Sequence, residues 1–320
     1  SLTNQKALNR ILESTESVPF LFPAYDLVAI NSYHRTINKI KSLPYLTSRG
    51  CPYKCAFCGL NYMHEISKIR FAEPELVYEH LCRIKAMGIN AINFQDDNFT
   101  MKKSRLFKIL DLIQPLGFKF RCHGRAGQDD EEVYARLAEA GCVMVSWGCE
   151  SGSQYMLDRM NKASSVQDNI NVIRWAKKYG MTARAFFVLG FPGESFQTIE
   201  DTKKFITEAE PDQYFVSNFV PYPGTDVCRD PKKYGVVAME SDFDQYYQVS
   251  QDGYGGLTVD TEWLSRSQFR ELEENFRQWL KDNVPMKGNI LDYEKELYDK
   301  SKVGRIEVDR CNSTNWAVSE

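Results

Sequence analysis

Three cysteines close together constrain this chain more than any other feature. Cys51, Cys55 and Cys58 lie within residues 48–59, SRGCPYKCAFCG, with the spacing C-x3-C-x2-C. Thiolates are soft ligands suited to iron–sulfur clusters, zinc or copper(I), and most iron–sulfur clusters use four of them. The next cysteine after this run is Cys82, well outside it. A four-iron cluster held here would keep one iron open for another ligand, which favours an enzyme over a purely structural site.

The cysteine run resembles the signature of the radical S-adenosylmethionine superfamily. The resemblance implies that Cys51, Cys55 and Cys58 hold a 4Fe–4S cluster, and that the open iron is chelated by the amino and carboxylate groups of S-adenosylmethionine. In that family the reduced cluster cleaves this cofactor to a 5′-deoxyadenosyl radical, which abstracts hydrogen from a substrate. The resemblance also places Phe57, the aromatic residue before the third cysteine, near the adenine.

Composition limits the class of protein. The chain has 320 residues, of which 43% are hydrophobic, so it is long enough for one large domain or a domain with an extension. The net charge of -3, without any long Lys/Arg run, makes nucleic-acid binding unlikely. No apolar run is long enough for a membrane span. The nine cysteines are scattered through apolar segments, which is typical of free thiols in a reducing cytosol, and we therefore expect a cytoplasmic protein.

Apolar runs typical of strands alternate with amphipathic runs typical of helices. The predicted strands are residues 45–48, 89–94, 118–122, 143–147, 182–189 and 213–219, and the predicted helices between them are 75–87, 104–116, 131–140, 166–179 and 196–209. This alternation predicts an α/β fold, a six-stranded parallel partial (β/α)6 barrel with a mainly helical C-terminal extension. Chemistry in such sheets lies at the carboxyl ends of the strands, where the cysteine run is also predicted to lie.

The chain is expected to have three parts. Residues 1–43 form an N-terminal lead-in, residues 44–228 the radical S-adenosylmethionine partial barrel, and residues 229–320 an extension that covers the barrel mouth and begins its main helix at residue 265. The lead-in resembles the linker that follows a cobalamin-binding domain in one subfamily. That domain's motif, Asp-x-His-x-x-Gly, is absent from the sequence, so cobalamin is possible but no domain that binds it is expected in this chain.

Polar residues follow the second and third predicted strands. Where the family has a Gly-Gly-Glu-like segment this chain has Gln95-Asp96-Asp97-Asn98, so Asp96 or Asp97 can accept a hydrogen bond from the amino group of the cofactor, or the segment can form a turn. His123 and Arg125 suit a substrate or cofactor carboxylate and are candidate catalytic residues, although each can equally be a packed side chain.

The fourth and fifth predicted strands end in segments that resemble family motifs. In Gly148-Cys149-Glu150-Ser151-Gly152 the resemblance implies that Glu150 binds the ribose hydroxyls and Ser151 lies near the methionyl part, while Cys149 is a third catalytic candidate. The alternative is a turn capped by Ser151. The turn Gly190-Phe191-Pro192-Gly193-Glu194 resembles a family turn whose backbone contacts the adenine. The resemblance implies such contacts from Leu189 and Gly190. Arg184 lies within the fifth strand, where its charge needs a partner such as a cofactor carboxylate or a salt bridge.

Several functions stay open at this stage. Cys51, Cys55 and Cys58 with His64 would also make a Cys3His zinc site, and the protein could be a non-catalytic iron–sulfur electron-transfer protein. Within enzymes, we expect a small-molecule or saccharide-like substrate and rearrangement, epimerisation, dehydration or, with cobalamin, methyl transfer. A tRNA-modifying enzyme is the alternative. A reductant such as flavodoxin or ferredoxin is expected as a partner, and the sequence predicts neither the substrate nor the oligomeric state.

Overall fold

The computed structural model describes residues 20–28, 30, 35–60, 69–246, 249–250, 253–254 and 257–285. All of them belong to one compact unit, residues 1–286. The second unit, residues 287–320, lies outside the described residues.

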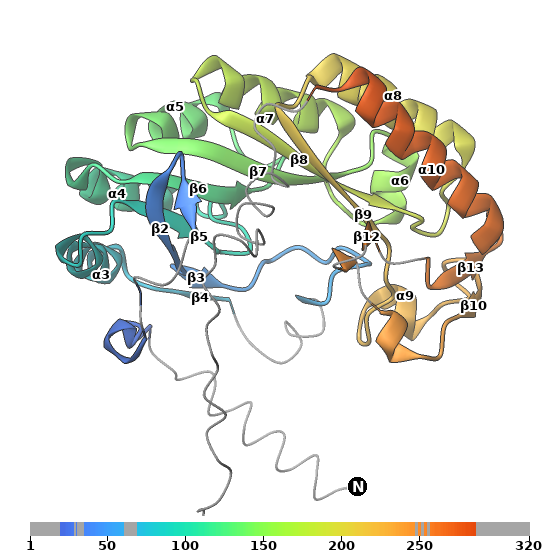
Figure 1. Ribbon diagram of the computed structural model, residues 1–320, viewed down its shortest axis with the longest axis horizontal. Helices are drawn as coiled ribbons and strands as arrows, with labels where there is room; N and C mark the ends of the chain where they lie inside the picture. The colour runs from blue at the N-terminus through green and yellow to red at the C-terminus, as the bar shows by residue number, and fades with distance from the viewer. Residues whose placement is uncertain are drawn as a thin grey trace, which may run out of the picture. The chain divides into compact units, whose positions relative to one another are not determined.

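A curved seven-stranded sheet organises the described part of the chain (Figure 1). Its order is β1 (Thr36–Ile37), β2 (Ile40–Tyr45), β5 (Ala91–Phe94), β6 (Lys119–Gly124), β7 (Cys142–Glu150), β8 (Thr182–Leu189) and β9 (Gln213–Asn218). β1 pairs antiparallel with β2, and the other six strands are mutually parallel. The predicted α/β class and six-stranded parallel partial barrel are confirmed.

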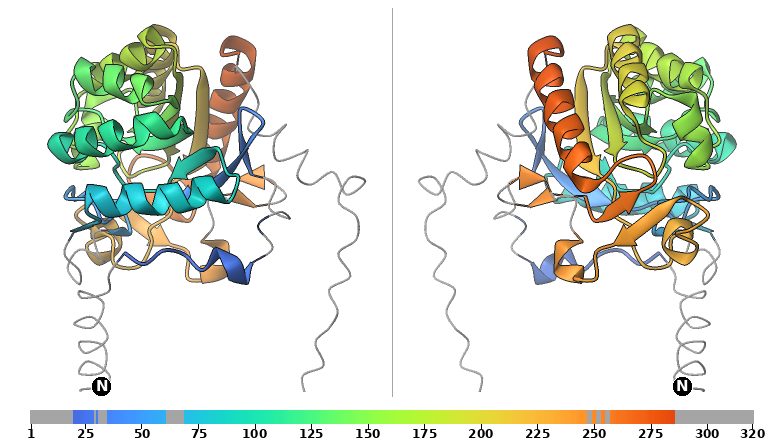
Figure 2. Two further views of the ribbon diagram at one scale, coloured as in Figure 1. Left: turned by 90° about the vertical axis from the view of Figure 1, so that its left-hand side faces the viewer. Right: turned by 90° about the vertical axis from the view of Figure 1, so that its right-hand side faces the viewer.

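Helices cover one face of this sheet, as Figures 1 and 2 show. They are α3 (Pro74–Ala86), α4 (Lys103–Ile113), α5 (Glu131–Glu139), α7 (Val166–Lys178) and α8 (Phe196–Ala209), with a short 3-10 turn η3 (Gln114–Leu116) after α4. Ser165 and Ser195 begin α7 and α8 with capping boxes, which satisfy backbone N–H groups at the first turn. Each predicted helix is confirmed to within a few residues.

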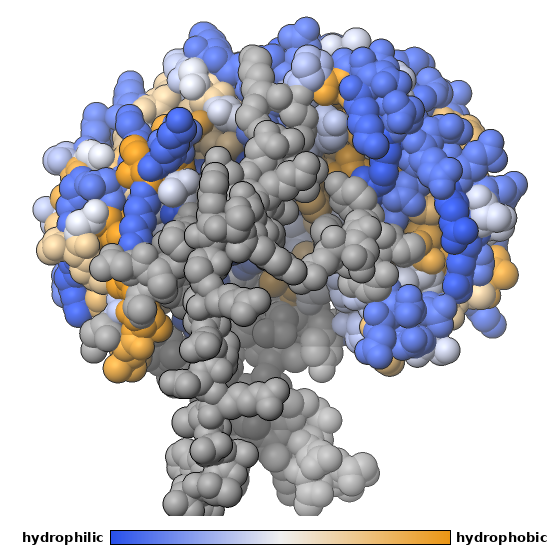
Figure 3. Space-filling model, viewed as in Figure 1, coloured by the Kyte–Doolittle hydropathy of each residue, from blue (hydrophilic) through white to orange (hydrophobic). Residues whose placement is uncertain are grey.

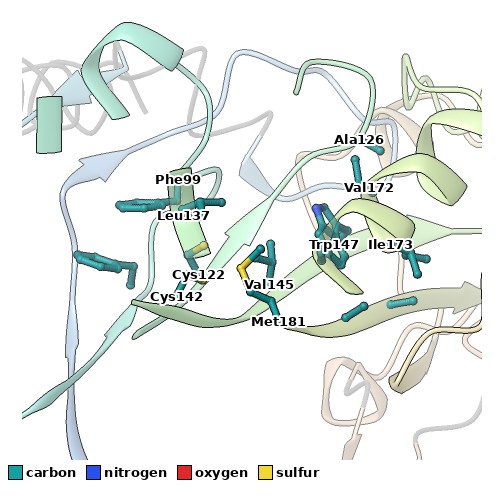
Figure 4. Close-up of a cluster of buried hydrophobic side chains, with 14 of the residues drawn as sticks. Phe99, Cys122, Ala126, Leu137, Cys142, Val145, Trp147, Val172, Ile173 and Met181 are labelled. Carbon is teal, nitrogen blue, oxygen red and sulfur yellow. The ribbon is translucent and has the colours of Figure 1, made fainter. Parts of the chain in front are cut away.

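The hydrophobic core lies between the sheet and these helices. Along β6 and β7, Cys122, Val145 and Trp147 point into it and meet Val172 and Ile173 of α7 (Figure 4). Because side chains alternate along a strand, the residues between them lie on the opposite, concave face of the sheet. That face is therefore available for a functional site.

The first parallel strand differs from the prediction. It is β2, Ile40–Tyr45, and the predicted strand at residues 45–48 is wrong. Pro44 and the polar Lys41 and Ser42 hide the strand in the sequence. Proline is tolerated because β1 pairs only with the start of β2, so the N–H side of Pro44 faces no neighbouring strand.

The C-terminal part of the described chain contains a long helix and small sheets. α10 (Arg266–Asn283) confirms the predicted helix and buries Phe269, Leu272, Phe276 and Leu280 against the core. It lies along β9, where Arg277 Nη1 donates to the carbonyl of Val216 at 3.3 Å. The sequence did not predict α6 (Gln154–Arg159), α9 (Asp226–Arg229), η4 (Phe243–Gln245), or the paired strands β10 (Val236–Met239) with β13 (Val259–Thr261) and β11 (Val249–Ser250) with β12 (Gly253–Tyr254).

The outer surface over α8 and α10 is mostly hydrophilic in Figure 3. Exposed apolar side chains occur near η1 (Tyr25–Leu27), where Leu21 is 72% and Leu27 is 80% exposed. Within the part of the chain that the structure describes, no helix combines the length and apolar character that crossing a bilayer requires.

Candidate functional site

The three cysteines lie within residues 50–60, which we call the cysteine loop. β3 (Ser48–Arg49) pairs antiparallel with β4 (Arg70–Phe71), so the chain leaves and returns at one place. Inside this cysteine loop, the backbone N–H of Ala56 donates to the carbonyl of Met160 at 2.8 Å. The segment after α6 thus holds the loop against the barrel.

The surroundings of Cys51 and Cys58 disfavour the charged form of these two thiols. Cys55 is buried, and Cys51 and Cys58 are half-buried. Burial raises the pKa of Cys51, and burial with the neighbouring Cys55 and Cys51 raises the pKa of Cys58 to about 11. These mutual effects show that the three side chains are close together. Thiolate ligands at this place need positive charge beside them.

Arg125 supplies such a charge. Its Nη1 lies 3.6 Å from Sγ of Cys55, and its guanidinium stacks 3.6 Å above the ring centre of Tyr53, itself a residue of the cysteine loop. The side chain is 7% exposed, yet Nε and Nη2 have no hydrogen-bond partner among the described residues. Burying an arginine with unused donors is costly, which indicates that a ligand can bind beside it and accept from these donors.

A bulge at the end of β7 directs Glu150 toward the cysteine loop. The pairing of β7 with β8 shifts register between Gly148 and Glu150, so Cys149 is the extra residue. Glu150 has a φ of 61°, a left-handed conformation that is unfavourable for a residue with a side chain. Bulges next to functional sites commonly re-aim a side chain, and local strain of this kind is often found there.

Lys162 is the partner of Glu150. Its Nζ donates to Oε1 of Glu150 at 2.8 Å, and the side chains are 9% and 8% exposed. Burial alone would lower the pKa of Lys162, but Glu150 and then Cys55 outweigh it and the pKa is raised. The Lys162 ammonium also lies 5.9 Å from the ring centre of Phe57. A buried cation and carboxylate therefore stand beside the thiols.

These groups border one cavity of about 350 Å³ at the carboxyl ends of the strands. Its wall combines one thiol of the cysteine loop with carboxylates, amides and cationic or imidazole side chains, most of which lie at or just after the ends of β5, β6 and β7. The lining residues are Cys51, Gln95, Asp96, Asp97, Asn98, His123, Gly124, Arg125, Ser146, Gly148, Glu150 and Lys162. The structure thus brings together strand-end residues that the sequence suggested separately.

Asp96 and Asp97 have different surroundings although they are adjacent. Asp96 is fully buried and accepts hydrogen bonds from the hydroxyls of Thr47 at 2.7 Å and Ser48 at 2.5 Å. Asp97 is exposed at the cavity and accepts from the backbone N–H of Gly50 at 2.8 Å. Asp96 therefore holds the strand that leads into the cysteine loop, and Asp97 is the one positioned to meet a ligand.

His123 and Arg184 lie on the concave face of the sheet. His123 borders the cavity, and burial, followed by the charges of Arg121 and Arg184, lowers its pKa to about 4. Arg184 lies on β8 with its guanidinium bonded to the side-chain oxygen of Gln213 at 2.6 and 2.9 Å. It has no salt bridge to a described residue and does not line the cavity itself.

Cys149 and Ser151 lie away from the cavity. Cys149 is fully buried in the core on the helical side, and burial raises the pKa of its thiol. The Ser151 hydroxyl lies 3.3 Å from that of Thr202 on α8 and accepts from the N–H of Ser153 at 3.1 Å. Among the candidates of this motif, the geometry joins only Glu150 to the site.

The adenine candidates Phe57, Leu189 and Gly190 are not among the residues that line the cavity. Phe57 meets the ring of Phe191 edge to face, with 6.3 Å between ring centres. The side chain of Leu189 is in the core, so only its backbone can face a ligand. At Gly190, which has a φ of 77°, a Cβ atom would lie 2.8 Å from Phe269, so a side chain there would clash with α10.

The cysteine loop could in principle hold either one zinc ion or a 4Fe–4S cluster, and the spacing of its side chains distinguishes the two. In the described ranges, no three His, Cys, Asp or Glu side chains are grouped so that they could hold a single metal ion. In a 4Fe–4S cluster each thiolate binds its own iron, so such cysteines are spaced more widely than the ligands of one zinc ion. His64, the fourth ligand of the zinc alternative, lies outside the described residues.

Sequence reasoning did not single out two charged residues of this region. Lys162 is twelve positions after Glu150, and α6 lies between them in the sequence, so no local pattern indicates the pair. Arg121 did leave a signal, because it is two residues before His123 on one strand and must therefore share its face.

A comparison of the sequence with known protein families points to the same region of the chain. The family model described as the Radical SAM superfamily matches residues 45–206, which include the cysteine run and the ends of β5 to β8.

Two curated relatives are methyltransferases by name. An uncharacterized methyltransferase, PH0819, of Pyrococcus horikoshii is 30% identical over 67% of this chain and 46% of its own length. The bacteriochlorophyllide d C-8(2)-methyltransferase of Chlorobaculum tepidum is 25% identical over 77% of this chain and 58% of its own. The chain thus spans about half the length of the curated relatives it matches.

A solved structure has a similar fold. It is the radical S-adenosylmethionine methyltransferase TsrM from Kitasatospora setae, with cobalamin and a [4Fe–4S] cluster bound. The TM-score is 0.62 at 14% identity, covering 79% of this chain and 54% of that one. At this identity the likeness concerns the fold alone.

Proposed function

The chain belongs to the Radical SAM superfamily, and from this premise we propose that it is a radical S-adenosylmethionine enzyme whose 4Fe–4S cluster is held by Cys51, Cys55 and Cys58. The observation that carries the proposal is that Cys51, Arg125 and the Glu150–Lys162 pair line one cavity, while Arg125 also lies beside Cys55.

The residues of this chain fit an iron–sulfur cluster. Cluster and thiolates together carry negative charge, and Arg125 offers Nε and Nη2 without partners while Nη1 lies beside Cys55. Lys162 adds a second buried cation near the thiols. When bound, such a cluster supplies the electron for reductive cleavage of S-adenosylmethionine to a 5′-deoxyadenosyl radical.

Side chains around the cavity would bind and orient the cofactor. Asp97, exposed beside Gly50, would accept a hydrogen bond from the amino group. Glu150 would accept from the ribose hydroxyls, and its contact with Lys162 would hold the carboxylate in place. Phe57 and the backbone at Gly190 would border the adenine. Arg125 is proposed to act beside the cluster and is not assigned a step in the chemistry of the substrate.

Methyl transfer is the proposed reaction type. The names of the two curated relatives support it. Cobalamin would then be an additional cofactor. A small-molecule substrate, a flavodoxin or ferredoxin reductant and a cytoplasmic location complete the proposal.

The test is the fate of S-adenosylmethionine. Anaerobically reconstituted protein is incubated with the cofactor and a strong reductant, with and without hydroxocobalamin, and the products are separated by chromatography. We expect 5′-deoxyadenosine, and S-adenosylhomocysteine as well once cobalamin and an acceptor are present. Exclusive formation of S-adenosylhomocysteine would contradict radical chemistry, and an intact cluster without any cofactor cleavage would support an electron-transfer protein.

A further inference from the structure

A turn between β6 and α5 holds the cysteine loop through one tyrosine. The Tyr53 hydroxyl donates to Oε1 of Gln128, a residue of this turn, at 3.1 Å. On the face of the same ring lies Arg125, with its guanidinium 3.6 Å from the ring centre. Tyr53 therefore connects Gln128 to the arginine that lies beside Cys55.

The neighbours of Gln128 fix the orientation of its amide. Nε2 lies 2.8 Å from Oγ1 of Thr100 and 3.3 Å from Oδ1 of Asp129. The Thr100 hydroxyl lies 2.9 Å from Oδ2 of Asp129, which takes its one proton, so its oxygen is free to accept from Gln128. An ionised carboxylate can only accept. The NH2 group of Gln128 therefore faces these acceptors, and Oε1 faces Tyr53.

Asn98 completes this orientation from the cavity side. The Asn98 and Gln128 amides form two reciprocal hydrogen bonds, Nδ2 to Oε1 and Nε2 to Oδ1, each 3.0 Å long. Asn98 is buried and lines the cavity together with Cys51. The link between the turn and the cysteine loop thus lies at the edge of the proposed site.

The same network is anchored in the core. Tyr134 donates to Oδ2 of Asp129 at 3.0 Å, and Nε1 of Trp147 donates to the Tyr134 hydroxyl at 3.0 Å. Tyr134 and Trp147 are fully buried, and Trp147 points into the core in Figure 4. A polar network whose members are satisfied in this way is rigid. Gln128 is therefore a fixed point against which the cysteine loop is held.

Arg125 is the charged group at the end of this link. It forms no ion pair with any described residue, and the Tyr53 ring on which it stacks attracts the guanidinium without cancelling its charge. Nη1 lies 3.6 Å from Sγ of Cys55. Charge and hydrogen bonds near the sulfurs set the potential of an iron–sulfur cluster, and a positive charge favours the reduced form because reduction adds negative charge. The effect depends on distance, so it depends on what holds the guanidinium.

We propose that Gln128 is a positioning residue: by fixing Tyr53 it holds the Arg125 guanidinium beside Cys55 and thereby raises the reduction potential of the cluster in the cysteine loop. The inference rests on the proposed function, because it concerns the cluster assigned there.

The experiment measures the midpoint potential of the reconstituted protein in a redox titration followed by electron paramagnetic resonance. It is run at about pH 8, above the pKa of Asp129, which is about 7. Gln128→Met removes the amide, and Tyr53→Phe removes only the hydroxyl and keeps the ring. Each should lower the one-electron equilibrium constant for reduction by about fivefold, about 40 mV at 59 mV per tenfold. The double variant should shift no further than the larger single shift, because both changes break one link.

A background without the arginine charge separates positioning from a purely structural role. Once Arg125→Met has removed the charge, adding Gln128→Met should change the equilibrium constant by less than about twofold. If Arg125→Met takes up no iron, Arg125→Lys replaces it with the same expectation, since lysine lacks the planar fork that stacks on Tyr53. A shift of equal size with and without the arginine would overturn the inference. An unchanged potential in both Gln128→Met and Tyr53→Phe, or loss of the cluster from Tyr53→Phe, would also overturn it.

Asn161 provides a control for general loosening of the loop. Its Nδ2 donates to the carbonyl of Lys54 at 2.7 Å, and its φ of 51° suits glycine. In protein without iron, amide hydrogen exchange in residues 51–58 should rise in both Gln128→Met and Asn161→Gly. The potential should shift only in Gln128→Met, and the exposed Gln197→Met should change neither quantity.

The control outcomes are decisive in the same way. An equal potential shift in Asn161→Gly, or unchanged exchange in Gln128→Met, would overturn the inference. If wild type takes up no cluster, the proposed function fails. If wild type takes up the cluster and cleaves S-adenosylmethionine but its potential ignores Gln128 and Tyr53, only this inference fails.

Discussion

The Nζ atom of Lys162 lies 2.8 Å from Oε1 of Glu150, and both side chains are more than nine-tenths buried. Gly148 makes this approach possible, because a Cβ atom there would lie 2.9 Å from the same Nζ and would also collide with the carboxylate. The pair thus joins the end of β7 to the residues that follow α6, next to the cysteine loop.

This pair makes a testable contribution to stability. Removing one partner leaves an unpaired buried charge, so Glu150→Gln and Lys162→Met should each lower the free energy of unfolding by about 3 kcal/mol. The double variant should lose clearly less than the sum, because neither charge then remains. Urea unfolding measures all three.

The exposed pair Arg174–Glu208 is the control for this cycle. Its side chains are 53% and 56% exposed, and removing either should cost less than about 1 kcal/mol. Strictly additive losses at Glu150 and Lys162 would show that the two charges do not interact in solution.

Adjacent aspartates should respond differently to the same substitution. Asp96→Asn removes acceptors from the buried Thr47 and Ser48 groups and should cost about 2 kcal/mol of stability, measured by urea unfolding. Asp97→Asn should leave stability nearly unchanged and weaken binding of S-adenosylmethionine by about tenfold. The opposite pattern would mean that Asp96, and not Asp97, meets the cofactor.

Glu194 makes stability depend on pH. Burial raises its pKa to about 7, although Thr198 Oγ1 donates to it at 2.6 Å and the N–H of Gly190 at 3.1 Å. The folded protein therefore binds a proton that the unfolded chain releases near its ordinary pKa of 4.5. The free energy of unfolding should fall as pH rises through this window and level off above the folded pKa.

Urea unfolding at about pH 5 and about pH 8 tests this dependence. From the lower to the higher pH, the free energy of unfolding of wild type should fall more than that of Glu194→Gln. The variant Glu208→Gln, at an exposed position, should show the same fall as wild type. Asp129, whose pKa is also raised to about 7, remains in every variant and cancels from the comparison. Equal slopes in wild type and Glu194→Gln would contradict a buried, proton-binding Glu194.

Much of this fold was predictable because its signals are local. The strands and helices from residue 89 to residue 219 follow apolar periodicity, and their carboxyl ends place Asp97, Arg125 and Glu150 at one edge before any contact is known. The first parallel strand was missed because the polar Lys41 and Ser42 and then Pro44 interrupt its apolar residues. The proline is tolerated because β1 pairs only with the start of this strand.

The site was only partly predictable, because its detail depends on tertiary contacts. The bulge at Cys149 turns that thiol into the core and Glu150 toward Lys162, which no residue pattern reveals. Asp96 and Asp97 look equivalent in sequence until the fold buries one of them.

The central claim is that the cysteine loop holds a four-iron cluster with one iron left for S-adenosylmethionine. The most direct measurement is the electron paramagnetic resonance spectrum of the reduced, reconstituted protein before and after the cofactor is added. We predict a 4Fe–4S signal that changes on addition, is lost in Cys55→Ala and is kept in Cys82→Ala, whose cysteine lies on α3 outside the loop. A spectrum that the cofactor leaves unchanged, or full cluster occupancy in Cys55→Ala, would contradict the claim.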